Sequence, residues 1–531
     1  MRLLNPSILI AAAALLATGC QPPESRKPRQ PARPQASVAA PEVPDVVVVA
    51  APADAGLPPA PPAPDQSFRA TPPTPRPVAD VKLPTVAPFT LDNGLEVYLV
   101  EQNKLPTVFM SFEFDAGEID DPADKTGMVS VCLDLYSEGT AELDKIAFAE
   151  KQADHAVTIW SPAGKETSTI NLRTLKSELG PALDLLGALL RAPGLREQDF
   201  QRIIAQRKAS LQQARATPQS VAMRLFSSRV WGRDHGYGRV QMESDIEAIT
   251  LDDCRAFAAR LKPDGARLWV VGMVSKDELT AALNQRLAFW QGAAPTPKRL
   301  PAAPKPDGAI HFVQVDGAVQ AFVLLGHVGP ARSADDYVAT HLMTQILGGS
   351  FSSRINMNLR EDKGWAYGGR GRISYRRQGS QLAIYASVEN ATAALAIGEM
   401  LREIKGMRDA EPTADELARE QQGALEALPA KFASPSETLN TLKRLAFFGL
   451  PLDYYLGYQA SLREVDAAAV RAAAVAHLPD KGWSALVVGD GTMKAQGSDK
   501  TVLEALRELA ASKRLGDGGL VVTDADGLPL E

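Results

Sequence analysis

The chain has 531 residues, and its 57 lysines and arginines nearly balance its 63 aspartates and glutamates, so the formal net charge is −6. This balance gives no reason to expect a nucleic acid as partner. Hydrophobic residues make up 45% of the chain and charged residues 23%, as in ordinary globular proteins, and the length indicates two to four domain-sized units.

The N-terminus predicts a secretory signal followed by a lipid anchor. The apolar run ILIAAAALLATG is too short to span a bilayer but has the length of a signal-peptide core. The residues LATGC, which end at Cys20, resemble a bacterial lipobox, although Ala17 stands where that motif usually has leucine. The alternative is a plain secretory signal with an incidental cysteine. We expect a signal peptide at residues 1–19, lipidation of Cys20, and a lipid-anchored protein of the bacterial cell envelope, at the outer membrane and facing the periplasm.

Residues 20–88 are rich in proline and alanine and poor in aromatic residues, as in PPESRKPRQPARP and LPPAPPAPDQ. Such a segment buries too little apolar surface to offset the entropy lost on ordering. We therefore expect a disordered linker between the lipid anchor and the folded part of the chain.

From residue 89 the chain shows one order of elements twice. Two strands are expected first, in FTLDNGLEVYLVEQ around the turn Asp92-Asn93-Gly94. Hydrophobic patterns then predict a strand, a helix, a strand and two helices, at 108–117, 126–139, 167–175, 178–192 and 195–215. The same five elements are predicted again at 321–330, 335–349, 380–388, 391–407 and 414–428. This repeat predicts an α+β fold built from two homologous lobes.

The boundaries of the two lobes follow from composition. Residues 287–306 are rich in proline and alanine and indicate a connector. We therefore place the N-terminal lobe at residues 89–295 and the C-terminal lobe at residues 296–512. Residues 513–531 indicate a tail with at most one short strand.

Two motifs carry a family resemblance. DAGEIDDPADKTGMVSVCLDLYSEGT, residues 115–140, and LGGSFSSRINMNLREDKGWAYG, residues 347–368, resemble in this duplicated setting the pitrilysin/insulinase family of zinc metallopeptidases, the inverzincins. The chain looks like a bacterial, processing-peptidase-like member, and the similarity covers roughly residues 89–490. The resemblance implies two metallopeptidase-like lobes that form a clamshell, and a peptide substrate.

The resemblance also implies where a zinc site should lie, and the residues for that site are missing. In the family a helix carries H-x-x-E-H, whose positions i, i+3 and i+4 share one face, so that two histidines bind zinc and the glutamate activates water. Ungapped alignment places Ser130 and Asp134 at the histidines and Leu133 at the glutamate, and the family's spacing places Ser210 at the third ligand, a glutamate. We therefore expect this chain to bind no metal and no cofactor, and to have no catalytic residue of its own.

Residues that could form a substitute site are sparse. The cysteines Cys20, Cys132 and Cys254 are widely spaced and match neither a zinc finger nor a CxxC motif, so the sequence predicts no disulfide framework. No two of the six histidines stand three or four positions apart; they are His155, His235, His311, His327, His341 and His477.

Unlike the first motif, the second motif contains the functional residue types that the family pattern has at its positions. In the family an arginine and a tyrosine, seven positions apart in the C-terminal half, reach across to the zinc site, and Arg360 and Tyr367 have this spacing. Both side chains are donors suited to a substrate carbonyl and to the oxyanion formed from it, so the resemblance implies a substrate-binding role. The alternative is a helix-terminal arginine and a packing tyrosine. Gly348, Gly349 and Gly364 are expected to form tight turns near a bound peptide, although glycines also serve as helix caps.

This asymmetry leads to two hypotheses, and the sequence leaves enzyme activity open. In the first, the chain is the metal-free subunit of a heterodimeric pitrilysin-type peptidase. A partner with H-x-x-E-H supplies zinc, and this chain supplies Arg360, Tyr367 and half of the peptide chamber. In the second, a catalytically inert envelope lipoprotein uses the fold for binding or assembly, as superfamily members in respiratory complexes do. An autonomous peptidase is the third possibility, and it requires stoichiometric zinc on the purified chain.

Overall fold

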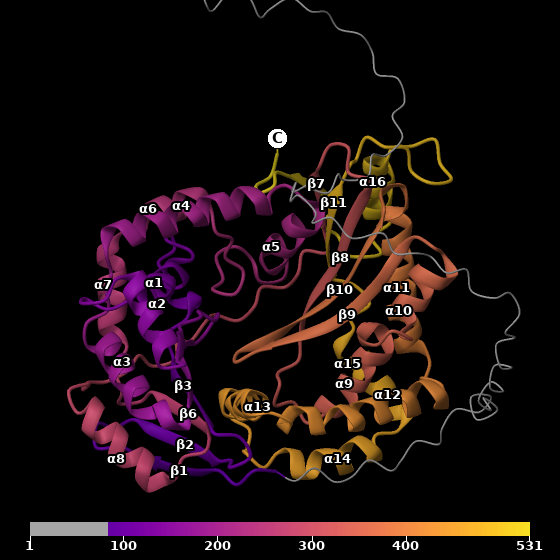
Figure 1. The fold of residues 1–531 in the computed structure, drawn as a ribbon. Coiled ribbons are helices and arrows are strands. Elements are labelled where there is room, and N and C mark those ends of the chain that lie inside the picture. The colour runs from indigo at the N-terminus through magenta and orange to yellow at the C-terminus, as the bar shows by residue number, and fades with distance from the viewer. Residues whose placement is uncertain (1–82, 531) are drawn as a thin grey trace, which may run out of the picture. The chain divides into compact units, whose positions relative to one another are not determined.

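Two six-stranded sheets, one in each half of the chain, organise the structure (Figure 1), a computed structural model that describes residues 83–530. The predicted signal peptide, Cys20 and nearly all of the predicted linker lie outside the described residues. The first sheet contains β1 (Ala87–Thr90), β2 (Glu96–Glu101), β3 (Thr107–Phe114), β4 (Thr158–Trp160), β5 (Ser168–Leu175) and β6 (Arg267–Gly272). The second contains β7 (Ile310–Gln314), β8 (Gln320–Gly329), β9 (Ala366–Arg376), β10 (Gly379–Glu389), β11 (Ser484–Gly489) and β12 (Leu520–Thr523).

The two sheets repeat one topology. The first has the order β1-β2-β6-β3-β5-β4 and the second the order β12-β7-β11-β8-β10-β9, so β2, β6, β3, β5 and β4 correspond to β7, β11, β8, β10 and β9. In both sheets the second and third strands of this order pair in parallel, and the following strands pair antiparallel. The structure thus confirms the predicted α+β fold of two lobes.

Helices surround both sheets. Those of the first half are α1 (Met128–Tyr136), α2 (Lys145–Asp154), α3 (Leu179–Arg191), α4 (Glu197–Ala214), α5 (Pro218–Trp231), α6 (Glu243–Ala248), α7 (Leu251–Arg260) and α8 (Lys276–Leu287). Those of the second half are α9 (Tyr337–Thr344), α10 (Arg354–Asn356), α11 (Ala393–Asp409), α12 (Ala414–Ala427), α13 (Pro435–Phe447), α14 (Tyr455–Glu464), α15 (Ala467–His477) and α16 (Val502–Ala511). Among residues 83–530 no helix is both long and apolar enough to cross a membrane.

One helix from each half of the chain packs against the sheet of the other half. Helix α5 packs against β8 and β11, where its Leu225 joins a buried cluster with Phe322 and Leu324. Helix α13 packs against β6 (Figure 1), and its Leu442 joins a buried cluster with Trp269. Both contacts bury large apolar side chains, and this burial holds the two halves of the chain together.

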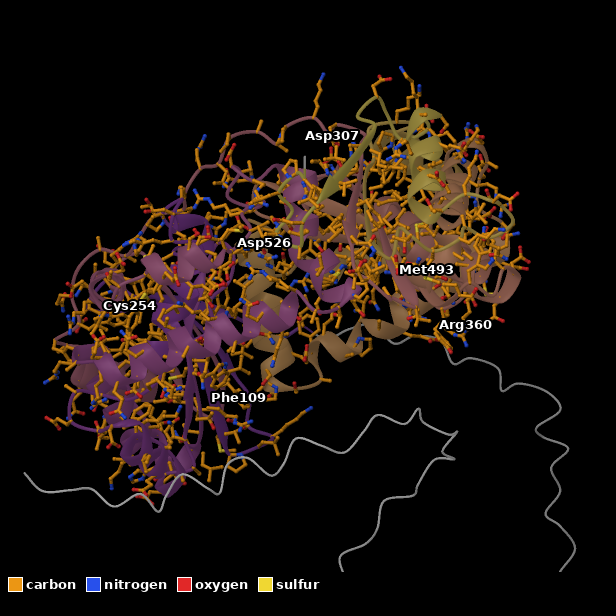
Figure 2. All side chains as sticks on the ribbon, turned by 90° about the horizontal axis from the view of Figure 1, so that it is seen from above. Phe109, Cys254, Asp307, Arg360, Met493 and Asp526 are labelled. Atoms are coloured by element: carbon orange, nitrogen blue, oxygen red, sulfur yellow. A yellow bond between two sulfur atoms is a disulfide. The ribbon has the colours of Figure 1, made fainter. Side chains whose placement is uncertain are left out.

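The C-terminal segment reinforces this exchange. Strand β12 pairs in parallel with β7, and the residues after it turn toward α4 and α5. Asp526 (Figure 2) accepts hydrogen bonds of 2.6 Å from Arg215 and 2.6 Å from Arg224. Burial opposes ionisation of the Asp526 carboxyl, but these two guanidinium groups outweigh it and hold the pKa below its usual range. The residues predicted as a tail therefore contribute both a sheet strand and a charged anchor.

Candidate functional site

Helix α1, which aligns with the zinc-binding helix of the family, is a packed scaffold element. It begins after Gly127, whose φ of 94° lies in the left-handed region that favours glycine. Leu133 is fully buried in the core of the first lobe, whereas Ser130 is half-buried and Asp134 is exposed. A glutamate at Leu133 would therefore face apolar neighbours rather than a water molecule.

An arginine occupies the face of α1 on which zinc ligands would converge. Arg207 of α4 donates a hydrogen bond of 2.8 Å to the Ser130 hydroxyl and also pairs with the Asp134 carboxylate. Ser210 lies one turn further along α4, and a pocket of about 470 Å³ is lined by Asp134, Arg207 and Ser210 together. The structure thus brings three of the four aligned positions together around a guanidinium group.

These residues do not fit zinc. A structural or catalytic zinc site needs at least three nitrogen, sulfur or carboxylate ligands, and here two positions are hydroxyls and the one carboxylate is already paired. The Arg207 guanidinium is permanently charged and would repel a dication held at the same place. Within residues 83–530, no cluster of three or more His, Cys, Asp or Glu side chains is arranged to hold a metal ion.

Arg207 leads to a prediction about restoring the metal site. A variant with Ser130→His, Asp134→His and Ser210→Glu regains the ligand types, but we expect it to bind zinc poorly while Arg207 remains. Adding Arg207→Ala should raise zinc affinity by at least about tenfold, because it removes the competing charge. Zinc titration followed by calorimetry measures the difference. Equal affinities with and without Arg207 would show that this arginine does not exclude the metal.

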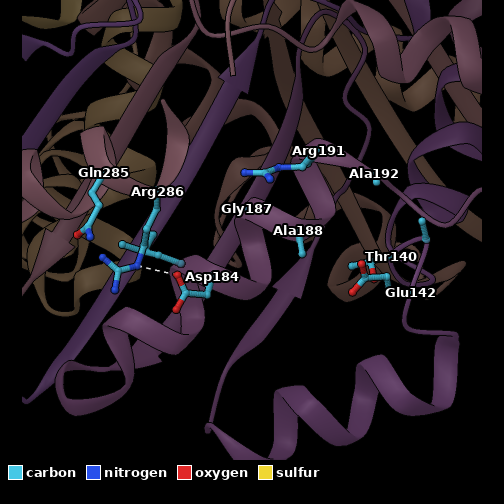
Figure 3. Close-up of a pocket in the computed structure, with 11 residues that line it drawn as sticks. Thr140, Glu142, Asp184, Gly187, Ala188, Arg191, Ala192, Gln285 and Arg286 are labelled. Atoms are coloured by element: carbon cyan, nitrogen blue, oxygen red, sulfur yellow. Dashed lines mark hydrogen bonds and ion pairs between the residues drawn. The ribbon is translucent and has the colours of Figure 1, made fainter. Parts of the chain in front are cut away.

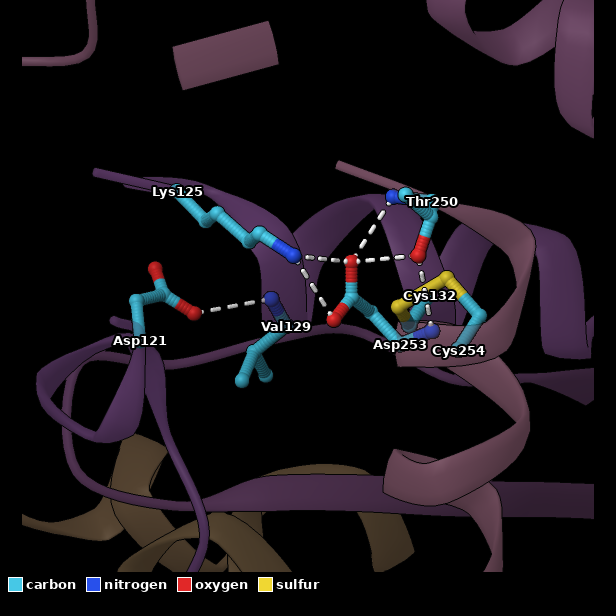
Figure 4. The surroundings of a disulfide bond; sticks show 7 residues. All are labelled: Asp121, Lys125, Val129, Cys132, Thr250, Asp253 and Cys254. Carbon is cyan, nitrogen blue, oxygen red and sulfur yellow. Dashed lines mark hydrogen bonds and ion pairs between the residues drawn. A yellow bond between two sulfur atoms is a disulfide. The ribbon is translucent and has the colours of Figure 1, made fainter. Parts of the chain in front are cut away.

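A disulfide joins α1 to α7, which corrects the expectation that the chain has no disulfide framework. Cys132 and Cys254 are bonded across 122 residues of sequence and are both buried (Figure 4). Beside the bond, Lys125 forms an ion pair of 2.7 Å with Asp253 in the first turn of α7. Sequence spacing could not indicate the pairing, because the fold alone brings α1 and α7 together.

Arg360 and Tyr367 lie on either side of a tight turn in the second lobe. Arg360 is in the helical turn Met357–Asp362, and Tyr367 is the second residue of β9. A hydrogen bond of 2.9 Å from the Trp365 amide to the Leu359 carbonyl closes the turn between them. Tyr367 is 88% exposed, so its hydroxyl is free to meet a ligand from outside.

The Arg360 side chain is only loosely engaged. It is about 40% exposed, forms an ion pair of 3.2 Å with its neighbour Glu361, and lies over the ring of Phe351. Figure 2 shows Arg360 and Cys254, the cysteine bonded to α1, on opposite sides of the view. Among the described residues, no hydrogen bond or ion pair joins Arg360 or Tyr367 to α1.

Buried polar residues that the sequence did not single out hold this turn in place. Asn356 accepts a hydrogen bond of 3.0 Å from the Gly369 amide, which ties the helical segment to β9. Asn358 donates to Glu399 and Glu403 of α11, at 2.8 and 2.7 Å. These hydrogen bonds of buried side chains help to fix the backbone around Arg360. In the sequence, the two asparagines of NMNLRE could have indicated these hydrogen bonds, because asparagine is uncommon in a buried helical segment.

A half-buried ion pair anchors the start of the same segment. Arg354 binds Glu416 of α12 through two hydrogen bonds, of 2.7 and 2.8 Å. The hydrogen bond from Arg354 is the main cause that lowers the pKa of Glu416 to about 2. The pair thus couples α12 to the turn that carries Arg360.

Glu416 gives a pH prediction. Its folded-state pKa is lowered from 4.5 to about 2, so the stability it contributes is present above about pH 4.5 and is lost as the pH falls through 2. The contribution amounts to about 3 kcal/mol. Glu416→Gln should flatten the dependence of unfolding free energy on pH between 5 and 2, whereas Glu411→Gln, at an exposed position nearby, should leave it unchanged. Denaturant titrations at several pH values check this, and equal slopes in all three proteins would contradict the assignment.

The three predicted turn glycines differ in what requires them. Gly364 has a φ of +67°, so the turn before Tyr367 needs a residue that tolerates the left-handed region. A side chain at Gly348 would clash with the backbone of Gly371 in β9, so close packing requires this glycine. A side chain at Gly349 would meet only the flexible end of Gln345.

A further pocket lies between α3, α8 and the segment that follows α1. It has a volume of about 640 Å³ and is lined by Thr140, Asp184, Arg191 and Arg286, among others (Figure 3). Arg286 donates a hydrogen bond of 2.8 Å to Asp184 within it. Its described lining includes no histidine or cysteine.

The chain is similar to several proteins of one peptidase family. Residues 248–424 match the family model described as peptidase M16 inactive domain. A Helicobacter pylori protein named non-peptidase homolog YmxG is 23% identical over 360 residues, which are 67% of this chain and 82% of that protein. Zinc protease PqqE of the same species is 24% identical over 299 residues, 53% of this chain and just under two thirds of that protein, 65%. A crystal structure of a peptidase M16 inactive domain from Pseudomonas fluorescens shares the fold, with a TM-score of 0.71 at 23% identity over 78% of this chain and 99% of that one.

Proposed function

Because this chain belongs to the pitrilysin family, M16, and carries none of its zinc ligands, we propose that it is the metal-free subunit of a heterodimeric peptidase. A partner of the same family supplies H-x-x-E-H and the zinc ion. This chain supplies Arg360, Tyr367 and half of the chamber that encloses a peptide. The observation that carries the proposal is a contrast between the two motifs. In the first, Arg207 occupies the face of α1 where zinc would bind. In the second, the turn that bears Arg360 and Tyr367 is held by hydrogen bonds from behind and presents Tyr367 to solvent.

The chemistry of the exposed pair suits this role. The Arg360 guanidinium and the Tyr367 hydroxyl donate hydrogen bonds, and they can bind the carbonyl oxygen of a peptide bond and the oxyanion formed when water attacks it. Arg354, Asn356 and Asn358 hold the turn from behind, so the donors need little reorganisation to bind.

Two further observations support the proposal. Helicobacter pylori has both a non-peptidase homologue and a zinc protease similar to this chain, which is the pairing that a heterodimer requires. The buried Cys132–Cys254 disulfide suits an oxidising compartment, as expected for an envelope protein held by a lipid on Cys20.

A second candidate function is an inert envelope lipoprotein that uses the fold for binding or assembly. It is favoured by the contacts of Arg360 with Glu361 and Phe351, which give this side chain partners within its own lobe. The two candidates differ in what happens when a zinc-bearing family member from the same organism is added.

Co-purification followed by a peptidase assay separates them. We expect the tagged chain to retain the zinc-bearing member, and the mixture to cleave unfolded peptides much faster than either protein alone. Complex formation without a gain in hydrolysis would favour the assembly role. A partner that cleaves equally well without this chain would overturn the proposed function.

A further inference from the structure

A pocket of about 340 Å³ in the second lobe is lined by residues of α9, α12 and α14. Figure 1 shows where these helices lie. Three tyrosines line it, together with apolar residues of α12. The lining residues that can contact a ligand through polar or aromatic groups include Tyr337, His341, Gln345, Lys431, Tyr455 and Tyr458.

One cation lines the pocket, Lys431, and a second, Arg332, lies behind its tyrosines. Arg332 is 93% buried, and its guanidinium lies 3.4 Å from the ring centroid of Tyr337 and 4.9 Å from that of Tyr454. The Lys431 ammonium lies 5.8 Å from the ring centroid of Tyr455. Neither cation forms an ion pair with a carboxylate in residues 83–530. Because Arg332 is buried and Lys431 is half-buried without a paired anion, the pocket favours a negatively charged group beside Lys431.

The nearby carboxylates are engaged elsewhere. Glu420 lines the pocket but accepts hydrogen bonds from Ser350, at 2.8 Å, and from Arg419, at 3.2 Å. Asp336 pairs with His477 at 2.6 Å. Glu437 favours the charged form of Lys431 only from beyond ion-pair distance. The positive charge is therefore available to a ligand.

The remaining polar groups of the pocket are neutral. Burial, with the charges of Lys431 and Arg332, lowers the pKa of His341 to about 4, so its imidazole is uncharged at neutral pH. The Gln345 amide and the His341 ring can donate or accept hydrogen bonds beside the ammonium. Ala424 and Leu428 add apolar groups to the lining, and we call these two residues the apolar wall.

We propose that this pocket binds an organic carboxylate with an aromatic or branched apolar body. The carboxylate lies against the Lys431 ammonium, and the body packs between the tyrosine rings and the apolar wall. A bare inorganic anion such as phosphate would leave the apolar wall unused. The same chemistry is offered by a free carboxylic acid and by the C-terminal residue of a peptide.

Calorimetry on the full chain tests the proposal with four probes. These are phenylacetate, its neutral counterpart phenylacetamide, a tetrapeptide ending in phenylalanine as the free acid, and the same peptide as the C-terminal amide. We expect at least one acid to bind and both amides to bind at least about tenfold more weakly, because only the acids pair with Lys431. An acid-form peptide that binds more tightly than phenylacetate identifies a peptide terminus as the source, and the reverse order identifies a free acid.

Variants locate the binding. Lys431→Gln should weaken binding of the acids by at least about tenfold. Lys405→Gln, at an exposed lysine paired with Asp409, should leave their binding unchanged. Thermal unfolding checks that both variants are folded. In wild type the bound acid should raise the pKa of His341, as followed by NMR, because a nearby anion favours the imidazolium.

The proposal is overturned by equal binding of acids and amides, by unchanged binding to Lys431→Gln, or by no acid binding up to about 10 mM. Binding of inorganic phosphate with no binding of either acid also overturns it, since the site would then recognise charge without an apolar body.

Discussion

Arg360→Ala should lower kcat/KM of the reconstituted heterodimer by about 10²–10³-fold, because loss of one oxyanion donor removes about 3 kcal/mol of transition-state stabilisation. Arg360 is about 40% exposed, and among residues 83–530 its ion pair is with Glu361 and its ring contact with Phe351, so the change should leave the fold intact. Tyr367→Phe, which removes one hydroxyl from an 88% exposed side chain, should have an effect of the same kind.

The matched control is Arg370→Ala, at an exposed arginine three residues beyond Tyr367 on β9. If the pair acts on the transition state, Arg370→Ala should retain nearly full activity, whereas Arg360→Ala and Tyr367→Phe should have a lower kcat. Steady-state kinetics with a fluorogenic peptide measure all three. A normal kcat with an altered KM in Arg360→Ala would assign this arginine to ground-state binding, and no change in either constant would remove it from the site.

Replacing both Cys132 and Cys254 by alanine should lower the free energy of unfolding by about 2–5 kcal/mol. The disulfide closes a loop of 122 residues, and its loss enlarges the conformational freedom of the unfolded chain. Both cysteines are buried, so the variant also loses packing between α1 and α7. Guanidinium titration of wild type and variant measures the change.

Reductant provides the control for the disulfide. Adding it during unfolding should destabilise wild type and leave the double variant unchanged, because only wild type has a bond to lose. Equal midpoints for wild type with and without reductant would show that the disulfide does not constrain the unfolded state. The two-state assumption is best tested first, by comparing midpoints from fluorescence and circular dichroism.

The order of elements could be predicted from the sequence because each strand and helix carries its own hydrophobic pattern. The repeated strand, helix, strand and paired helices are present in both lobes, and α1 and α4 lie where they were expected. Strand β9 is harder to recognise, since AYGGRGRISYR is rich in glycine, a poor strand former, and its pairing with β10 decides its conformation. The exchange of α5 and α13 between lobes depends on contacts between residues more than 90 positions apart.

Only part of the candidate site could be predicted from the sequence. The positions of Ser130, Leu133, Asp134 and Ser210 followed from alignment with the family motif, and so did the spacing of Arg360 and Tyr367. Arg207 did not, because its contacts with α1 join residues 73 and 77 positions apart and exist only in the folded chain. The pair Cys132–Cys254 was hidden for the same reason.

The zinc content of this chain, purified alone and within the complex, tests the central claim most directly. The account predicts far less than one zinc per isolated chain, about one zinc per heterodimer, and loss of that zinc when the partner's H-x-x-E-H histidines are replaced. Stoichiometric zinc on the isolated chain, or zinc that remains in the complex after the partner's histidines are removed, would contradict it.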